Sequence, residues 1–297
     1  MAIEGILPVI PTPFLDGRFD RASFQRLLDH MLPGVDGYTL LGSTGEAPSL
    51  STAERMEVAE AALAMTPSSA TVVIGVTHTS VEEAVTLARH AQEHGAHGVL
   101  CAMPYYFANT PSGLLRYLSR LDEALSIELV LYDNPAATGT TLGIDQVIGY
   151  AAELEHLHSV KLTDHRLGKI AAWQDAGLTV LAGDDPILFR FLAAGVDGAM
   201  VIAPCLFPLA FRRTWDLARG GVPGGALAVM AETMLPVLHV FGIGDEIATS
   251  KVLLTQMGVF ASSEVRPPLQ AADAQRTELL AMALDLCRDG PPRGRAA

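Results

Sequence analysis

Short apolar runs alternate with longer amphipathic stretches from residue 5 to about residue 220. Eight runs carry Val, Ile or Leu at consecutive rather than alternate positions, which is typical of strands buried on both faces of a parallel sheet. The runs are residues 5–13, 37–42, 71–76, 98–104, 128–134, 158–163, 179–183 and 198–203. The chain therefore begins as a series of buried parallel strands.

The stretches between the runs have helical periodicity, and several begin at Ser, Thr or Asp and end near Gly or Pro. Examples are residues 51–65, 81–94, 112–125 and 186–194. Eight strand–helix units of about 25 to 30 residues predict a (β/α)8 TIM barrel. The alternative, an open doubly wound sheet, is disfavoured because no glycine-rich phosphate motif follows the first run.

Helical patterns continue without strands after residue 220, at residues 225–241, 246–257 and 271–287. We therefore predict an α/β chain in which residues 1–222 form the barrel and residues 223–290 form a C-terminal helical appendage. Residues 291–297 are polar and rich in Pro and Gly, so we expect a disordered tail.

Composition and charge exclude several classes of partner. The 297 residues are 49% hydrophobic, which is enough for a large core, and 33 acidic against 20 basic side chains give a net charge of −13. Such a charge repels nucleic acid and anionic membranes. The sequence has three scattered cysteines, and it shows neither an N-terminal signal pattern nor an apolar segment of about 18 residues. We therefore predict a soluble, cytoplasmic protein.

The three lysines, at positions 161, 169 and 251, are the first chemical clue. Lys169 and Lys251 lie in helical patterns and are expected at the solvated surface. Lys161 lies inside the sixth apolar run, so its ammonium is expected in or at the mouth of a packed barrel. A lysine so placed either pairs with a carboxylate, such as Asp164 or Asp184, or loses its proton and becomes a nucleophile toward a carbonyl. Spacing alone leaves both readings open.

Other polar residues follow the strands at the end where barrel enzymes place their chemistry. Ser43 and Thr44 lie in a glycine-flanked turn after the second run, where hydroxyls and backbone N–H groups can hold a carboxylate. Tyr106 follows the fourth run and Tyr132 lies near the end of the fifth, where a phenol can move a proton. Each is also compatible with an ordinary turn or packing role.

The seventh and eighth runs complete the predicted pocket. Gly183 is followed by Asp184 and Asp185, of which one is expected to cap the next helix and the other to face the pocket. Ile202 lies in an apolar stretch at the end of the eighth run, which predicts a distal pocket that is small or apolar. The nine histidines, including the neighbours His94 and His97, show no zinc-ligand spacing, so we predict no metal and no cofactor.

These motifs occur together in the order and at the spacings of a known family. They are Gly42-Ser43-Thr44-Gly45-Glu46, Pro104-Tyr105-Tyr106, Tyr132-Asp133-Asn134-Pro135, Val160-Lys161, Gly183-Asp184-Asp185 and Val265-Arg266-Pro267-Pro268-Leu269. On these residues the chain resembles the dihydrodipicolinate synthase and N-acetylneuraminate lyase family of class I aldolases over nearly its whole length.

The resemblance implies that Lys161 binds pyruvate or a related 2-oxo acid as an imine, without a cofactor. Tyr132 would be the acid/base group, and Ser43 with Thr44 would hold the carboxylate and relay protons. The resemblance also implies a homotetramer, a dimer of dimers, in which Tyr106 reaches the site of a neighbouring subunit. The expected ligands are a 2-oxo acid and, for a condensation, an aldehyde.

Two positions depart from the pattern of the family. Ala137 stands where the synthases carry an arginine for the acidic end of the second substrate, and Pro186 stands where the sialate lyases carry a second carboxylate. We therefore predict an aldolase or dehydratase outside the two namesake reactions, with its second substrate open. The alternatives are dihydrodipicolinate synthase proper, with Arg166 as the replacing cation, and a non-catalytic barrel that binds a 2-oxo acid.

Overall fold

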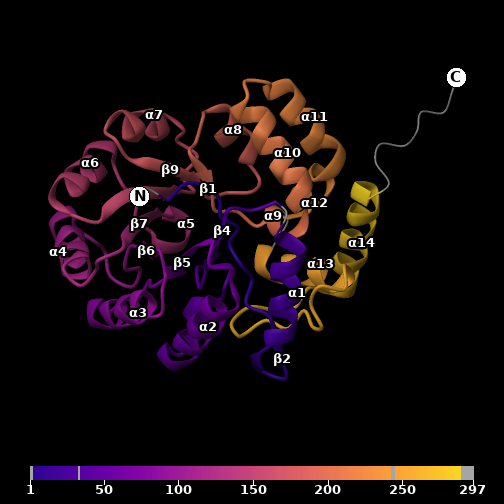
Figure 1. The fold of residues 1–297 in the computed structure, drawn as a ribbon, viewed down its shortest axis with the longest axis horizontal. Helices are drawn as coiled ribbons and strands as arrows, with labels where there is room; N and C mark the ends of the chain where they lie inside the picture. Colours follow the sequence, from indigo (N-terminus) through magenta and orange to yellow (C-terminus); the bar gives the residue numbers. More distant parts are fainter. Residues whose placement is uncertain (1–2, 33, 242–244, 289–297) are drawn as a thin grey trace, which may run out of the picture.

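The computed structural model describes residues 3–32, 34–241 and 245–288. At its centre eight parallel strands follow one another in the order β1-β10-β9-β8-β7-β6-β5-β4 (Figure 1). They are β1 (Gly5–Ile6), β4 (Gly37–Leu40), β5 (Thr71–Gly75), β6 (Gly98–Ala102), β7 (Glu128–Asp133), β8 (Leu157–Leu162), β9 (Thr179–Ala182) and β10 (Gly198–Ala199). A parallel bridge between Val9 and Thr39 joins the first strand's continuation to β4. The predicted (β/α)8 barrel is confirmed.

The strands are buried on both faces, as their consecutive apolar residues predict. Every residue of β6 and β7 is buried. The first strand is shorter than residues 5–13 because Pro8, Pro11 and Pro13 have no N–H to donate to a ladder. Its pairing nevertheless continues past β1, since the backbone N–H of Val9 donates to Val201.

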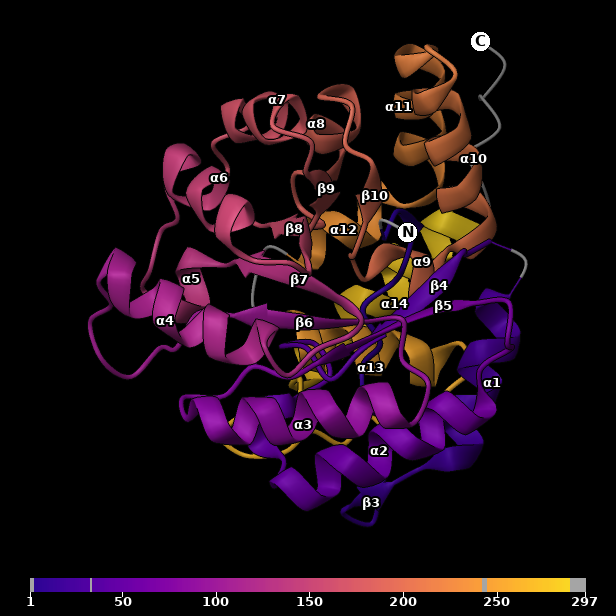
Figure 2. The same cartoon turned by 60° about the vertical axis from the view of Figure 1, so that its left-hand side comes forward.

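An outer layer of helices surrounds the barrel (Figure 2). It consists of α1 (Arg21–Met31), α2 (Thr52–Met65), α3 (Val81–Glu93), α4 (Pro111–Asp122), α6 (Ile144–Glu153), α7 (Gly168–Asp175), α8 (Leu188–Ala193) and α10 (Pro208–Arg219). Side-chain caps fix several starts: Ser51 and Glu54 form a capping box on α2, and Thr110 caps α4. A hairpin of β2 (Phe14–Leu15) and β3 (Arg18–Phe19) follows the first strand.

Short helical segments interrupt the loops at the C-terminal ends of three strands. They are the 3-10 turn Ala47–Ser49, α5 (Pro135–Thr138) and α9 (Ala203–Leu206). Each carries a proline within its first two positions, where the missing N–H has no intrahelical partner to lose. These turns bring the chain back from the strands to the outer helices around the barrel mouth.

Four helices follow the barrel: α11 (Pro223–Thr233), α12 (Leu235–Phe241), α13 (Glu246–Gln256) and α14 (Ala274–Arg288). The sequence predicted one helix over residues 225–241, but the structure bends by 74° between α11 and α12, next to Pro236. The predicted boundary after residue 222 falls between α10 and α11 and stays a prediction. The predicted tail, residues 291–297, lies outside the described residues.

The helix α13 is packed into the molecule along most of its length. Residues 248–254 are all buried, and α13 contacts both α9 and α14. Its first residues therefore reach the C-terminal end of the barrel. Across the described ranges, no single helix is long and apolar enough to span a membrane, although the bent pair α11 and α12 passes the same criteria together.

Candidate active site

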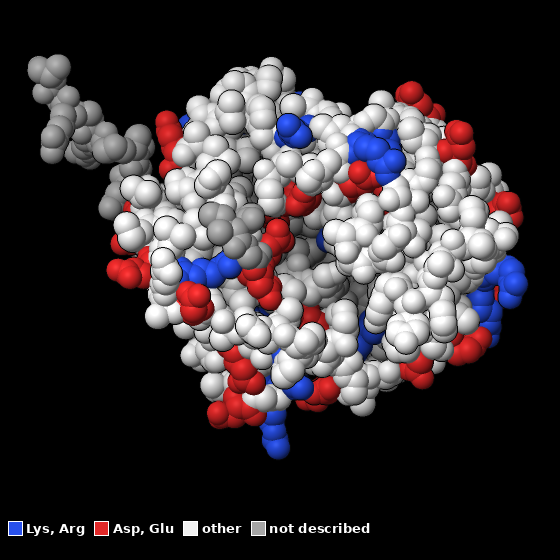
Figure 3. Space-filling model, turned by 180° about the vertical axis from the view of Figure 1, so that it is seen from behind, with Lys and Arg blue, Asp and Glu red and all other residues white. Residues whose placement is uncertain are grey.

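A cavity of about 790 Å³ opens at the C-terminal ends of the barrel strands. Figure 3 shows that this face of the molecule is hollowed near its centre and that acidic side chains border the hollow. Seven of the eight sequence-predicted site residues line the cavity: Ser43, Thr44, Tyr132, Lys161, Gly183, Asp184 and Ile202. Only Tyr106 is not among the lining residues.

Lys161 and Tyr132 form the centre of the cavity. They lie opposite each other on the neighbouring strands β8 and β7, so both side chains point to the same side of the barrel wall. The Lys161 Nζ lies 4.2 Å from the centre of the Tyr132 ring. Lys161 is 3% exposed and Tyr132 is 6% exposed. The phenol oxygen accepts a hydrogen bond from Asn134 Nδ2 at 3.0 Å, which orients it.

Gly183 leaves room for Lys161. A Cβ at this position would lie 3.0 Å from Lys161 Cε and 2.8 Å from Thr163 Cγ2, closer than ordinary van der Waals contact. The seventh strand can therefore approach the lysine only because residue 183 has no side chain.

The loop that carries Ser43 and Thr44 is held in place from outside the cavity. Glu46, two residues further along, is buried and forms an ion pair with the buried Lys251 of α13. Its second carboxylate oxygen accepts a hydrogen bond from the backbone N–H of Arg266 at 2.7 Å. The C-terminal segment thus fixes the position of the two hydroxyls at the mouth of the barrel.

The expectation that Lys169 and Lys251 lie at the solvated surface is wrong. Lys169 is 3% exposed, and its Nζ donates to Asp133 Oδ2 at 2.5 Å and to Asp164 Oδ2 at 2.6 Å. Lys251 is fully buried against Glu46 and also donates to the Glu264 carbonyl at 2.7 Å. Both lysines neutralise buried carboxylates, which offsets the cost of removing their charges from water.

Lys161 differs from the other two lysines because no described residue supplies its Nζ with a hydrogen bond or ion pair. The carboxylates that could have paired with it are engaged elsewhere. Asp164 bonds Lys169 and Arg166, and although burial opposes its ionisation, these bonds lower the pKa of Asp164 to about 2. The Asp184 Oδ2 atom lies at hydrogen-bond distance, 2.8 Å, from His165 Nε2. Of the two readings left open by spacing, the salt bridge to Asp164 or Asp184 is not observed, and the role of Lys161 as a nucleophile stays a prediction.

The acidic pair after the seventh strand divides between two tasks. Asp185 is 4% exposed and accepts hydrogen bonds from the backbone N–H groups of Ile202 at 2.7 Å and Ala203 at 2.8 Å. It therefore caps the start of α9 and not, as expected, that of the next helix α8. Burial raises the pKa of Asp185 to about 6. Asp184 faces the cavity as predicted, and burial raises its pKa as well.

The expectation of a small or apolar distal pocket is wrong, because the cavity measures about 790 Å³ and its wall carries polar side chains. The wall beyond Lys161 carries His165, Asp184 and Glu246 as well as the apolar Ile202. Burial and the charges of Asp185 and Asp184 raise the pKa of Glu246 to about 7. Sequence reasoning missed Glu246 because it belongs to α13, far along the chain, and no strand-end position marks it.

The cavity lining, as far as the structure describes it, contains no arginine. Arg166, the suggested replacement for the arginine of the synthases, is not a lining residue. Its guanidinium is 62% exposed and bonds Asp164 at 2.6 Å. Ala137, at the position where the synthases carry their arginine, does line the cavity. The described residues that line this cavity therefore offer no guanidinium to a ligand.

Tyr106 projects away from this chain's cavity. It is 79% exposed, and its ring packs edge-on against the equally exposed Phe107 with 5.1 Å between the ring centres. Tyr105 instead lines a neighbouring cavity of about 230 Å³ together with Ser43 and Tyr132. Two large aromatic side chains are thus left exposed beside the mouth.

Comparisons with known proteins agree with this architecture. The model of the dihydrodipicolinate synthetase family matches residues 2–286. A 4-hydroxy-tetrahydrodipicolinate synthase of Methanococcoides burtonii is 30% identical over 287 residues, covering 95% of this chain and 97% of that protein. The structure of the corresponding synthase of Methylacidiphilum fumariolicum SolV has a TM-score of 0.91 at 27% identity, and covers 97% of this chain and 96% of that one. A prophage protein of the same family from E. coli K12, in complex with pyruvate, has a TM-score of 0.87 at 26% identity, covering 96% and 98%.

Proposed function

The chain belongs to the dihydrodipicolinate synthetase family of Schiff-base-forming lyases, and we propose that Lys161 is the residue that forms the imine with pyruvate or a related 2-oxo acid. The proposal rests on the position of Lys161 and on its lack of a carboxylate partner. Lys161 is buried at the C-terminal end of a barrel strand, lines the cavity of about 790 Å³ and has no carboxylate partner among the described residues. An amine in such a place can act as a nucleophile toward a carbonyl.

The proposed chemistry follows from this placement. The Lys161 amine attacks the keto carbon, and loss of water gives an iminium that withdraws electrons from the adjacent carbon. That carbon then loses a proton or a carbon substituent, and the electron pair is held as an enamine until a proton returns. Tyr132, with its oxygen held by Asn134, is placed to carry these protons. Ser43 and Thr44 would hold the carboxylate of the 2-oxo acid.

The charge of the cavity bears on the second substrate. Asp184 and Glu246 face the space beyond Lys161, and Ala137 offers no charge. Carboxylates repel a second carboxylate but accept hydrogen bonds from hydroxyl groups. We therefore propose that the second substrate, or the departing part of a cleaved one, carries hydroxyl groups and no carboxylate at its far end.

Synthesis of 4-hydroxy-tetrahydrodipicolinate is the activity named for the M. burtonii relative and is the main alternative. It requires the cavity to hold the acidic end of a second substrate. Aspartate semialdehyde condensation should therefore be slow or absent with this chain, and robust turnover would overturn the assignment of substrate class. A non-catalytic barrel would bind pyruvate without exchanging its methyl protons with solvent, whereas the enzyme should exchange them.

The exposed Tyr106 supports a homotetramer. Its ring and that of Phe107 form an aromatic surface beside the mouth, of the kind that a second subunit covers. We propose that Tyr106 reaches the site of the neighbouring subunit. Sedimentation analysis of the wild type and of Tyr106→Ser tests this, since a monomeric wild type with full activity would refute it.

Reductive trapping tests the role of Lys161. The protein is incubated with pyruvate, reduced with borohydride, digested and searched by mass spectrometry for an N-carboxyethyl lysine. The adduct is expected on Lys161 and absent from Lys161→Met. Lys169 and Lys251 serve as internal controls, because both are buried and both are paired with carboxylates. An adduct on either control, or none with pyruvate and a panel of other 2-oxo acids, would refute the proposal.

A further inference from the structure

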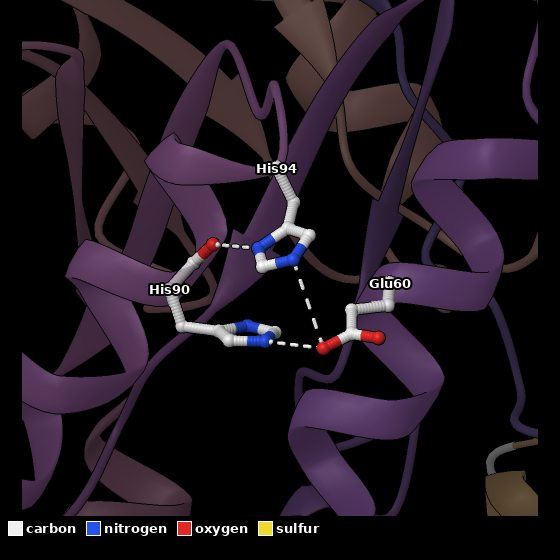
Figure 4. A group of neighbouring side chains, drawn as sticks. All are labelled: Glu60, His90 and His94. Carbon is white, nitrogen blue, oxygen red and sulfur yellow. Dashed lines mark hydrogen bonds and ion pairs between the residues drawn. The ribbon is translucent and has the colours of Figure 1, made fainter.

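Three potential metal ligands meet on the outside of the barrel, between α2 and α3. Glu60 comes from α2, and His90 and His94 come from the last turn of α3 and its C-cap (Figure 4). The strand β6 begins four residues after His94, at the end of the barrel where strands start. This cluster therefore lies at the opposite end of the barrel from the cavity that holds Lys161.

The spacing of the three side chains fits one ion. His90 and His94 are one helical turn apart, and their ring centres are 4.2 Å apart. The carboxylate oxygen Oε1 of Glu60 lies 2.9 Å from His90 Nε2 and 3.7 Å from His94 Nε2. A tetrahedral ion with bonds of about 2.0–2.1 Å keeps its ligand atoms about 3.3 Å apart. The two distances lie on either side of this value, so a small side-chain adjustment accommodates the ion.

The orientation of the His94 ring suits metal binding. Its Nδ1 lies 2.7 Å from the backbone carbonyl of His90, as the dashed line in Figure 4 shows. A carbonyl oxygen only accepts, so Nδ1 is the donor in this hydrogen bond and Nε2 is the ring nitrogen that lies toward Glu60. Histidine ligands of metal sites characteristically donate their other ring N–H to a carbonyl or carboxylate in this way.

We propose that Glu60, His90 and His94 form a binding site for a late first-row divalent metal ion, with Zn²⁺ as the reference ligand. Two imidazoles and one carboxylate suit zinc, nickel and copper better than magnesium or calcium. The side chain of Glu60 is 53% exposed and that of His94 is 40% exposed, so the remaining coordination positions face solvent. The bound ion links two neighbouring helices of the outer layer.

This site departs from the prediction of no metal, which compared His94 with the wrong partner. Residue His97 turns away and accepts a hydrogen bond from the backbone N–H of Val72 through its Nδ1 at 3.1 Å. The relevant pair is His90 and His94, a spacing of four that places both rings on one helix face. The third ligand comes from another helix and is visible only in the fold.

Calorimetric titration of chelator-treated protein with Zn²⁺ tests the proposal. The wild type is compared with His94→Gln and Glu60→Gln. The controls are His158→Gln, which removes another exposed imidazole, and Glu57→Gln, which removes an exposed carboxylate one turn earlier on α2. We expect the first two variants to lose one equivalent of Zn²⁺ per chain or to bind it at least about tenfold more weakly, since even partners behind a ligand contribute about 10–100-fold. The controls should bind as the wild type does.

Two further readouts locate the ion. Anomalous scattering from crystals soaked in Zn²⁺ should show a peak between the Glu60 and His94 side chains, and Zn²⁺ should raise the melting temperature of the wild type and of both controls but not of His94→Gln. Binding by the wild type that equals that of both ligand variants would overturn the proposal. Equal loss in His158→Gln and His94→Gln would overturn it as well, because the effect would then not depend on this cluster.

Discussion

The replacement Glu246→Gln tests whether ionisation of the partly buried Glu246 carboxyl lowers the stability of the fold. Burial, followed by the charges of Asp185 and Asp184, raises the pKa of Glu246 from 4.5 to about 7. A carboxyl whose pKa is higher in the folded state stabilises the fold fully below its unfolded pKa, and this contribution is lost as the pH rises through the folded value. Glutamine keeps the shape of the side chain and cannot ionise. The variant should therefore gain stability over the wild type as the pH rises from about 4.5 to about 7.

The size of the effect follows from the rise in pKa. A rise from 4.5 to about 7 costs the fold about 3.4 kcal/mol once the carboxyl is fully ionised, at about 1.36 kcal/mol for each tenfold change. Part of this cost is already present at pH 5, which leaves about 2.5 kcal/mol between pH 5 and pH 8. Because Glu246 is only partly buried, solvent screening reduces the expected difference to between about 1 and 2.5 kcal/mol.

Urea denaturation followed by circular dichroism at pH 5 and pH 8 measures this difference. Glu246→Gln should gain about 1 to 2.5 kcal/mol over the wild type between the two pH values. Glu232→Gln, which changes an exposed carboxylate of α11, serves as the control and should show no such gain. A stability difference for Glu246→Gln that is the same at both pH values would refute the reasoning.

Three other substitutions test the site and its support. Tyr132→Phe should lower turnover by about 100- to 10,000-fold while borohydride still traps pyruvate on Lys161, and unchanged turnover would remove the phenol from proton transfer. Gly183→Ala places a Cβ 3.0 Å from Lys161 Cε and should lower turnover by about 100-fold; full activity in a steady-state assay would show that the lysine has room to move. Lys251→Met should cost about 3–5 kcal/mol in urea denaturation because the Glu46 carboxylate stays buried without its partner, and the double variant with Glu46→Gln should recover part of this loss.

The strands were predictable from the sequence because their apolar residues are consecutive, as in β6 and β7. The lengths of the first and last strands were not, since the observed β1 and β10 each comprise only two residues. Prolines limit the first strand, and the chain turns into α9 soon after β10. The break between α11 and α12 was missed because a hydrophobic helical pattern does not by itself show where a helix changes direction.

The centre of the site was predictable for a geometric reason. Lys161 and Tyr132 end neighbouring parallel strands, and the register places them directly opposite each other. Contacts between segments that are remote in sequence were not predictable. Glu246 reaches the cavity only because α13 packs into the molecule, and the burial of Lys251 depends on Glu46, which lies more than half the chain away.

Lys161 has no salt bridge because residues outside its own strand bind the nearby carboxylates. Lys169 and Arg166 together hold Asp164, and His165 holds Asp184. Asp164 and Asp184 thus each have a side-chain partner other than Lys161. The Lys161 amine is therefore left without a salt bridge that would have to be broken before it attacks a carbonyl. The wall beyond Lys161 also carries the carboxyl groups of Asp184 and Glu246. These two groups are the basis of the proposal that the second substrate has no carboxylate at that end.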